Sequence, residues 1–541
     1  MVCQAWALQG YGAPLTIYGL YLLKIFFFVL AWGLFCVLPL DGVRLWDLSA
    51  WVFEATSFQK AILWSMAYEC LGFGCGSGPL TGRYLPPFGG ALHFLRPGTL
   101  RLPLFGSLPL FGGTRRSLLD VALYALHYVL ILRALCAPEL SAALLAPSVV
   151  LLPLMALRDK TLFLASRGEH YWVLCVCFLF GGEWVAAAIA VQVAIWMWAA
   201  FSKLNPHFPA VVCVMTSNSP LLRFASIRKA MYRRFPDDLR PSGLAVALAH
   251  CGTAVELCFP ILLVFGDGGV LTAIGLVSMV AFHAYITSNF PMAVPIEWNV
   301  VVVYSGLFLF WFQSGVSVWD VNSAPLIVFL AVFLVAVPLV GNLWPDRVSF
   351  LLSMRYYAGN WAYSAWIFGE GGLEKLDRGI VKSSPSVRRQ LSLLYDEEVA
   401  DGLLSKVLAF RLMHLHGRAL HALLPKAAPD LDSCHYMDGE VVAGLVLGWN
   451  FGDGHLHDER LMRAVQARCD FDPGQLRCIF VESQPLFGRG LKWRIVDANS
   501  GLIERGETPV RGLVDMQPWP SGQAPADGPP DGGDSGGARA F

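Results

Sequence analysis

Charged residues are scarce in this 541-residue chain, in which Asp, Glu, Lys and Arg together make up 15% of the sequence. A soluble domain usually contains roughly a quarter charged residues. Hydrophobic residues reach 55% and the mean hydropathy is +0.53, so the chain has too little polar surface to cover a water-soluble fold. The scarcity of charge excludes a soluble protein and predicts an integral membrane protein whose main partner is the lipid bilayer.

An excess of charge of one sign is also absent, because 40 Lys and Arg residues balance 40 Asp and Glu residues. This balance predicts no nucleic acid or other polyanion as a partner. The sequence further lacks a C-x-x-C pair, a phosphate-binding P-loop and a G-x-S-x-G nucleophile turn, and its apolar part contains no H-x-x-x-H. These absences argue against a zinc ribbon, a nucleotide hydrolase, a serine hydrolase and a histidine-box di-iron enzyme.

Two H-x-H sequences occur in the polar C-terminal part, at His414/His416 and at His455/His457. Two rings in this spacing point the same way on a strand but diverge on a helix. The first pair lies in a helical pattern and the second in a turn, so we predict no metal site.

Long apolar runs are abundant, and a membrane-spanning helix needs about 20 such residues. Good candidates are residues 15–40, 117–136, 184–202, 244–265, 269–288, 298–314 and 324–343. Weaker candidates are 58–74, 144–157, which contains Pro147 and Pro153, and the short run 170–181. The segments between 144 and 181 could instead be re-entrant where protein buries them. We therefore predict an α-helical membrane protein with 8–10 spans in residues 1–343.

Positive charge is concentrated in three loops, at residues 75–116, 158–169 and 203–243. Loops rich in Lys and Arg stay in the cytoplasm. With ten spans, all three loops fall on the same side of the membrane. We therefore expect a multi-pass protein of the cell inner membrane with both termini in the cytoplasm. The first run, from residue 15, is too long for the core of a signal peptide and is predicted to be a spanning helix.

The composition changes near Trp344. Residues 344–380 are rich in Trp and Tyr and predict an amphipathic segment on the membrane surface. Residues 381–515 combine helical patterns with short strand patterns such as LRCIFVES, and predict a small cytoplasmic α+β domain that could dock a protein partner. Residues 516–541 have little to bury and are expected to be a disordered tail.

Ionisable residues within the apolar runs each need a physical explanation, because burying a charge in a bilayer is costly. Lys24 lies well inside the first run and Glu69 inside the second. They could form an ion pair that only stabilises the fold, or they could line a polar cavity. Glu256 and His283 lie in later runs, where a lone histidine could simply be a packing residue.

Lys203 ends an apolar run in the sequence FSKLNPHFP. A lysine at a helix end is most simply a charge that reaches back to the membrane surface. The surrounding sequence supports a second interpretation. Residues 195–303 contain Lys203-Leu204-Asn205, then Glu256-Leu257, then Phe282-His283, each after or within an apolar run. This order resembles the horizontally transferred transmembrane domain of vitamin K-dependent gamma-carboxylase.

The resemblance implies that Lys203 acts as a general base on a quinone, with Glu256 or His283 in an orienting or relay role. We assign these three residues as catalytic, and we assign substrate binding to Asn205, His207, Lys24 and Glu69. The chain has no counterpart of the carboxylase's bulky lumenal domain, so glutamate carboxylation is not predicted. Over nearly its whole length the chain also looks like a bacterial family of multi-span proteins of unknown function, through stretches such as GCGSGPLTGRYLPP, SKLNPHFP and VESQPLFGR.

Three functions remain open at this point. The first is an integral membrane enzyme, resembling a membrane oxidoreductase or carboxylase, that acts on a quinone- or lipid-like substrate by base-assisted, oxidative chemistry. The second is a membrane transporter or lipid-binding carrier. The third is a non-catalytic membrane scaffold that docks a partner through residues 381–515.

Overall fold

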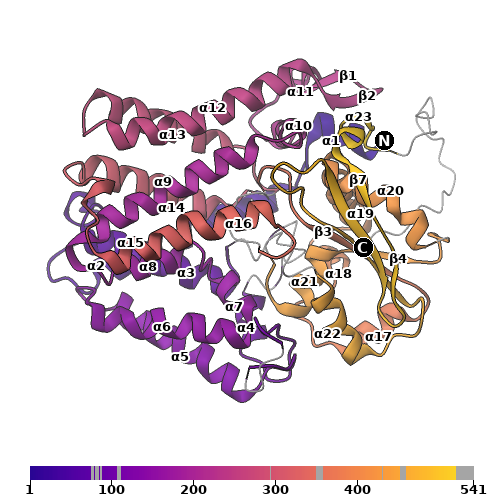
Figure 1. Ribbon diagram of the computed structural model, residues 1–541, viewed down its shortest axis with the longest axis horizontal. Helices are drawn as coiled ribbons and strands as arrows, with labels where there is room; N and C mark the ends of the chain where they lie inside the picture. Colours follow the sequence, from indigo (N-terminus) through magenta and orange to yellow (C-terminus); the bar gives the residue numbers. More distant parts are fainter. Residues whose placement is uncertain are drawn as a thin grey trace.

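Apolar helices occupy one side of the molecule and a β-sheet with its helices occupies the other (Figure 1). The computed structural model describes residues 1–519 except 75–77, 79–84, 86–87, 107–110, 293, 349–356, 429 and 451–457. In this described part, six helical segments are long and apolar enough to cross a membrane: Leu15–Val37, Leu118–Leu135, Gly181–Ser202, Gly243–Phe265, Val270–Thr287 and Ala324–Leu343. The predicted helical membrane protein is confirmed at this level.

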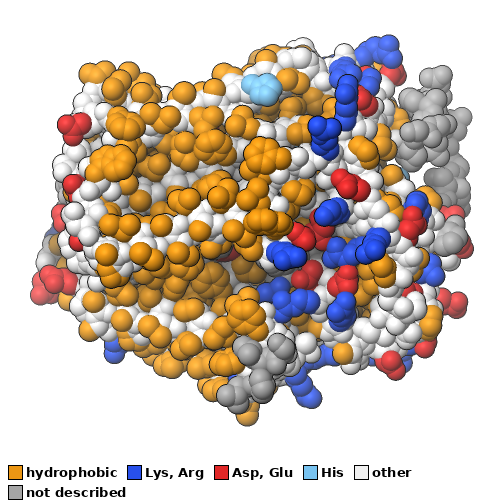
Figure 2. Space-filling model, viewed as in Figure 1, with side chains coloured by type: hydrophobic (Ala, Val, Ile, Leu, Met, Phe, Trp, Pro, Cys, Tyr) orange, Lys and Arg blue, Asp and Glu red, His pale blue; other side chains and the backbone are white. Residues whose placement is uncertain are grey.

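The long apolar helices correspond closely to the predicted runs. They are α2 (Leu15–Val37), α5 (Leu118–Leu135), α9 (Trp184–Lys203), α12 (Gly243–Phe265) and α13 (Val270–Thr287). α14 (Ile296–Leu307) continues into the π-helical turn Phe308–Phe312, and α15 (Ala324–Leu330) continues through the π-helical turn Ala331–Ala336 into α16 (Val337–Leu343). Their outward-facing side chains form the hydrophobic surface in Figure 2, which continues over most of this side of the molecule.

The weaker candidate spans form shorter helices. α3 (Ala55–Leu71) lies among the other apolar helices, and nearly all of its side chains are buried. α6 (Ala142–Arg158) runs without interruption through Pro147 and Pro153, so the prolines do not divide it into half-helices. The run 170–181 contains only α8 (Tyr171–Cys177), preceded by α7 (Lys160–Ala165). α4 (Gly89–Phe94) lies in the loop that precedes α5.

Shorter elements join the two sides of the molecule. α10 (Phe208–Asn218) and α11 (Ala225–Ala230) lead to the antiparallel hairpin of β1 (Tyr232–Arg234) and β2 (Asp238–Pro241). α1 (Val2–Gln9) packs against α10, where the Trp6 indole donates to the carbonyl of Val214 (3.1 Å). α1 also contacts α19 (Glu397–Met413) of the C-terminal region, through Trp6 and Phe410.

The C-terminal region contains a five-stranded antiparallel sheet of order β4-β3-β5-β6-β7. The strands are β3 (Tyr363–Phe368), β4 (His435–Asp438), β5 (Leu476–Val481), β6 (Gly490–Asp497) and β7 (Gly501–Pro509). One face packs on α20 (Leu415–Ala427) and α23 (Val510–Asp515). The remaining helices are α17 (Gly372–Gly379), α18 (Val387–Ser392), α21 (Gly439–Leu447) and α22 (Glu459–Cys469). The predicted sheet-containing C-terminal region is confirmed.

The structure differs in part from two expectations for this region, and residues 520–541 of the expected tail lie outside the described residues. Residues 363–368, expected within a membrane-surface segment, form β3, in which every residue is buried between β4 and β5. Aromatic residues suit a buried strand as well as a membrane surface, which explains the error. Residues 516–519, expected within a disordered tail, pack on the hairpin, because Gln517 accepts from the backbone N–H of Leu239 (3.0 Å) and donates to Asp238 (2.8 Å).

Candidate functional site

A large cavity lies where the apolar helices meet the C-terminal region. Its volume is about 890 Å³, and its wall is mostly apolar. Side chains from α9, α10, α12, α13 and α14 surround it, and the C-terminal region contributes Trp361, Phe410 and His414. Pockets that bind small molecules are mostly apolar and contain a few polar groups. This cavity has that character, and three of its polar residues are those that the sequence singled out: Lys203, Glu256 and His283.

Lys203 is the last residue of α9, and its side chain is buried at 7% exposure. The ammonium group Nζ lies 2.5 Å from Oε2 of Glu256 on α12, and it also lies over the rings of Phe208 and Phe282. A lysine that only anchored the helix end would place its charge in water. Lys203 instead points into the protein and pairs with a buried carboxylate.

His283 on α13 is held from both sides. Its Nε2 accepts a hydrogen bond from the Trp196 indole N–H (3.2 Å), and its Nδ1 lies 2.8 Å from Oδ1 of Asn299. The amide nitrogen of Asn299 donates to the carbonyl of Pro295 (3.0 Å), which orients the amide oxygen toward the histidine. An indole N–H can only donate. The network therefore describes a neutral imidazole with its proton on Nδ1.

Asn205 and His207 do not contribute to the cavity wall formed by the described residues. The Asn205 side-chain oxygen accepts from the backbone N–H groups of His207 (2.7 Å) and Phe208 (3.2 Å), so it shapes the turn from α9 into α10. His207 lies toward the C-terminal region, where its Nε2 lies 2.9 Å from the Gln484 side-chain oxygen. Asn205 thus shapes the chain after α9, whereas His207 joins the start of α10 to the C-terminal region.

Lys24 and Glu69 lie in a second buried cluster and form ion pairs with other partners than each other. Nζ of Lys24 is 3.5 Å from Glu297 at the start of α14, and Glu69 accepts from the Arg167 guanidinium at 2.8 Å. Of the two alternatives for Lys24 and Glu69, a direct ion pair between them is therefore ruled out. Arg167 also lies over the ring of Trp298, which lines the cavity, so this cluster supports the cavity wall from behind.

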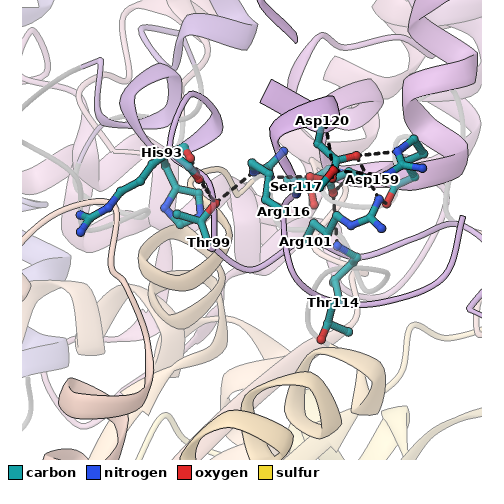
Figure 3. Close-up of polar contacts among 12 residues, drawn as sticks. His93, Thr99, Arg101, Thr114, Arg116, Ser117, Asp120 and Asp159 are labelled. Carbon is teal, nitrogen blue, oxygen red and sulfur yellow. Dashed lines mark hydrogen bonds and ion pairs between the residues drawn. The ribbon is translucent and has the colours of Figure 1, made fainter. Parts of the chain in front are cut away.

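A third polar cluster connects the loop after α4 to the ends of α5 and α6 (Figure 3). Arg116 pairs with Asp159 at 2.6 Å and donates to Thr99 at 3.0 Å, while Arg101 and Arg158 both pair with Asp120. Asp159 also accepts from the backbone N–H of Thr161 at the start of α7. These ion pairs hold the loop in place, and none of the residues named here lines the cavity.

Sequence reasoning missed several residues of the wall. Trp196 and Asn299 complete the histidine network, and Trp298, Trp361 and His414 lie against the cavity from α14 and from the C-terminal region. The sequence held no local signal for them, because they meet the site only through contacts between distant segments.

A metal site would need several ligating side chains close together. Among the described residues, no group of three or more His, Cys, Asp or Glu side chains is arranged to bind a metal ion. His455 and His457 lie outside the described residues.

Comparison with known proteins relates the chain to a protein family. A family model described as a transmembrane protein of unknown function (DUF3556) matches residues 1–528. No curated protein and no solved structure matches the chain.

Proposed function

Since the chain belongs to the DUF3556 family of transmembrane proteins of unknown function, we propose a function from its cavity: it is an integral membrane enzyme that binds a lipid-soluble molecule and acts on it by base-assisted chemistry. The observation that carries the proposal is the buried Lys203–Glu256 ion pair in the wall of an apolar cavity of about 890 Å³. Intramembrane ionisable residues commonly mark functional sites. A quinone or another lipid with a hydroxyl group fits this combination.

The ion pair can accept a proton from such a molecule. In the step that we propose, the O–H bond of the ligand breaks and the proton adds to the Glu256 carboxylate or, when the pair is neutral, to the Lys203 amine. In both cases the ligand oxyanion remains beside the Lys203 ammonium, which stabilises its charge. The neutral His283, held by Trp196 and Asn299, would orient the ligand in this step, as a positioning residue.

The membrane topology supports a site on the cytoplasmic side. We propose ten crossings, with both termini in the cytoplasm of a cell whose inner membrane holds the protein. The turns 38–54, 136–141, 178–183, 266–269 and 313–323 contain seven acidic residues and one basic residue, Arg44. Lys and Arg gather instead toward the C-terminal region, as Figure 2 shows on one face. Alkaline phosphatase fused after Asp320 should be active and fused after Arg240 inactive.

Bound lipophiles provide the decisive test. The purified protein would be extracted with organic solvent and the extract identified by mass spectrometry, for wild type, Lys203→Ala and Lys60→Ala. Lys60 is the matched control, because it is a buried lysine of α3 that donates to the carbonyl of Phe35 (2.8 Å) and does not line the cavity. We expect a defined lipophile in wild type and Lys60→Ala, and its depletion in Lys203→Ala. Equal amounts of bulk lipid in all three would overturn the proposal and direct attention to what the C-terminal region binds.

A lipid carrier is the second candidate, because an apolar cavity can also carry a lipid without altering it. The double variant Lys203→Met/Glu256→Gln separates the two functions, since it removes both groups that can accept a proton and leaves the cavity without net charge, as in wild type. An enzyme should lose turnover of the identified lipophile in this variant. A carrier should keep both binding and flux in vesicles.

A further inference from the structure

The cavity is open on its apolar outer side and closed toward the C-terminal region. The charges of the polar groups in its wall cancel. From these features we propose that its ligand is an uncharged lipophile with a polar end, such as an alcohol or a quinol, and that it enters sideways from the bilayer. The inference rests on the proposed function and adds the class of ligand and its route.

The exposed edge belongs to the helices that carry the hydrophobic outer surface. Among the residues lining the cavity, Leu248 on α12 is 45% exposed, Tyr285 on α13 is 50% exposed, and Leu221 before α11 is 74% exposed. Cys251 on α12 is also exposed and lines the cavity. Lining residues that are exposed must lie at its mouth, so the mouth opens on the apolar side of the molecule.

The edge toward the C-terminal region is closed. Trp361, Phe410 and His414 line the cavity there, and their exposed fractions are 4%, 3% and 3%. His414 is fixed because its Nδ1 donates to the carbonyl of Phe410 (2.7 Å). These side chains separate the cavity from the surface of the sheet-containing region. The open edge at α12 and α13 therefore gives a ligand dissolved in the bilayer direct access to the cavity.

The polar groups of the wall select an uncharged ligand. The charges of Lys203 and Glu256 cancel, and His283 is neutral because Trp196 donates to it. A charged head group would find no unpaired opposite charge, and burying such a group is costly. The side-chain oxygen of Asn289, a buried residue that also lines the cavity, accepts no hydrogen bond from the described residues. It is available to a ligand hydroxyl.

Cys251 allows the mouth to be tested in membrane vesicles that contain the full-length protein. The exposed cysteines 136, 251 and 258, together with Cys434 and Cys75, would be replaced by serine, and Cys251 or Cys258 would then be restored singly. Cys258 is the matched control, because it is exposed on the same helix two turns away and does not line the cavity. Both should react with the lipid-soluble pyrene maleimide and resist a sulfonated, membrane-impermeant maleimide.

Three single-chain probes of equal length then define the ligand class: dodecanol, dodecanoate and dodecylammonium. We expect dodecanol to slow the labelling of Cys251 at concentrations about tenfold lower than the two charged probes, a difference of about 1.4 kcal/mol in binding. None of the probes should slow the labelling of Cys258. Glu256→Gln should shift the preference to dodecanoate, because it leaves the Lys203 charge unpaired. Lys203→Met should shift it to dodecylammonium, because it leaves the Glu256 charge unpaired.

The outcomes separate this inference from the proposed function. Rapid reaction of Cys251 with the impermeant maleimide, or a wild-type preference for a charged probe, would overturn the route or the ligand class while leaving a bound lipophile intact. If no probe protects Cys251 and no lipophile is extracted from wild type, the proposed function itself is wrong.

Discussion

The indole N–H of Trp196 on α9 donates to Nε2 of His283 on α13 across 3.2 Å. Because the indole cannot accept, this contact decides which ring nitrogen of the histidine carries the proton. The two residues are 87 positions apart, and both line the cavity. A side chain of α9 thus favours one chemical form of a polar group on α13.

The tautomer of His283 can be observed directly. In solid-state NMR of protein labelled with 15N-histidine, we expect the His283 signal to show a protonated Nδ1 and an unprotonated Nε2. The double variant Trp196→Phe/Asn299→Leu keeps an aromatic ring against Phe259 but removes both the indole donor and the amide acceptor, so the two tautomers should mix. Trp198→Phe is the control, because Trp198 donates to the carbonyl of Leu334 (2.7 Å) outside the cavity. A fixed tautomer in the double variant would contradict this account.

The Lys203–Glu256 ion pair should be strongly coupled in stability. Lys203→Met leaves a buried carboxylate without its partner, which typically costs about 3–5 kcal/mol. The double variant Lys203→Met/Glu256→Gln removes both charges, and we expect it to recover most of that loss. The measurement is the free energy of unfolding of the protein in mixed micelles. Losses that simply add in the double variant would show that the two residues do not interact.

Asp159 is expected to be the most sensitive member of the polar cluster in Figure 3. Asp159→Asn removes the charge that pairs with the buried Arg116 guanidinium and weakens the cap of α7. The expected loss is about 3 kcal/mol of stability, measured by the same unfolding method. Glu183→Gln is the control, because the Glu183 carboxylate accepts from the exposed backbone of Asn322 and Ser323 and should cost less than about 1 kcal/mol.

Arg468 on α22 should control how firmly the C-terminal region docks on the loop before α5. Its guanidinium donates to the backbone carbonyls of Gly98 (2.8 Å) and Thr114 (3.0 Å). In Arg468→Ala we expect faster amide hydrogen exchange in residues 98–104 and 111–116. Arg463→Ala on the same helix removes only an exposed pair with Glu459, and exchange there should be unchanged. Equal exchange in both variants would mean that Arg468 does not hold the loop.

Acid should loosen the contact between α10 and the C-terminal region. Burial lowers the pKa of His414 to about 3 and that of His207 to about 4. An unfolded histidine, with a pKa of about 6.5, binds a proton that the folded one excludes, so stability is full above pH 6.5 and is lost as the pH falls from there toward 4. The slope is up to about 1.4 kcal/mol per pH unit for each histidine.

The free energy of unfolding, measured at pH 7 and at pH 5, tests this prediction. The double variant His207→Gln/His414→Gln should reduce the pH dependence but not abolish it, because burial also lowers the pKa of the neighbouring His416. His250→Gln, at an exposed position of α12, should not change it. An unchanged pH dependence in the double variant would place the acid-sensitive groups elsewhere.

The sequence predicted local features well and distant contacts poorly. The run 184–202 became α9 and the run 244–265 became α12, because hydropathy over about 20 residues is a local property. Lys24 was matched to the wrong acid, because its partner Glu297 lies on α14, far along the chain. Arg167 was read as a loop charge, yet it is buried against Glu69 and Trp298. Lys203, Glu256 and His283 were assigned to one site through their order in the chain, because no local pattern places them together.

The placement of α1 has a consequence for biosynthesis. Lys406 of α19 donates to the side chain of Gln9 and the carbonyl of Gly10, and the first contact joins residues 397 positions apart. α1 can dock on α10 as soon as that helix is made, but α19 is translated much later, so the face of α1 that packs on α19 stays uncovered until then. Trp6, which contacts Phe410 in the finished protein, is therefore a side chain whose burial depends on both ends of the chain.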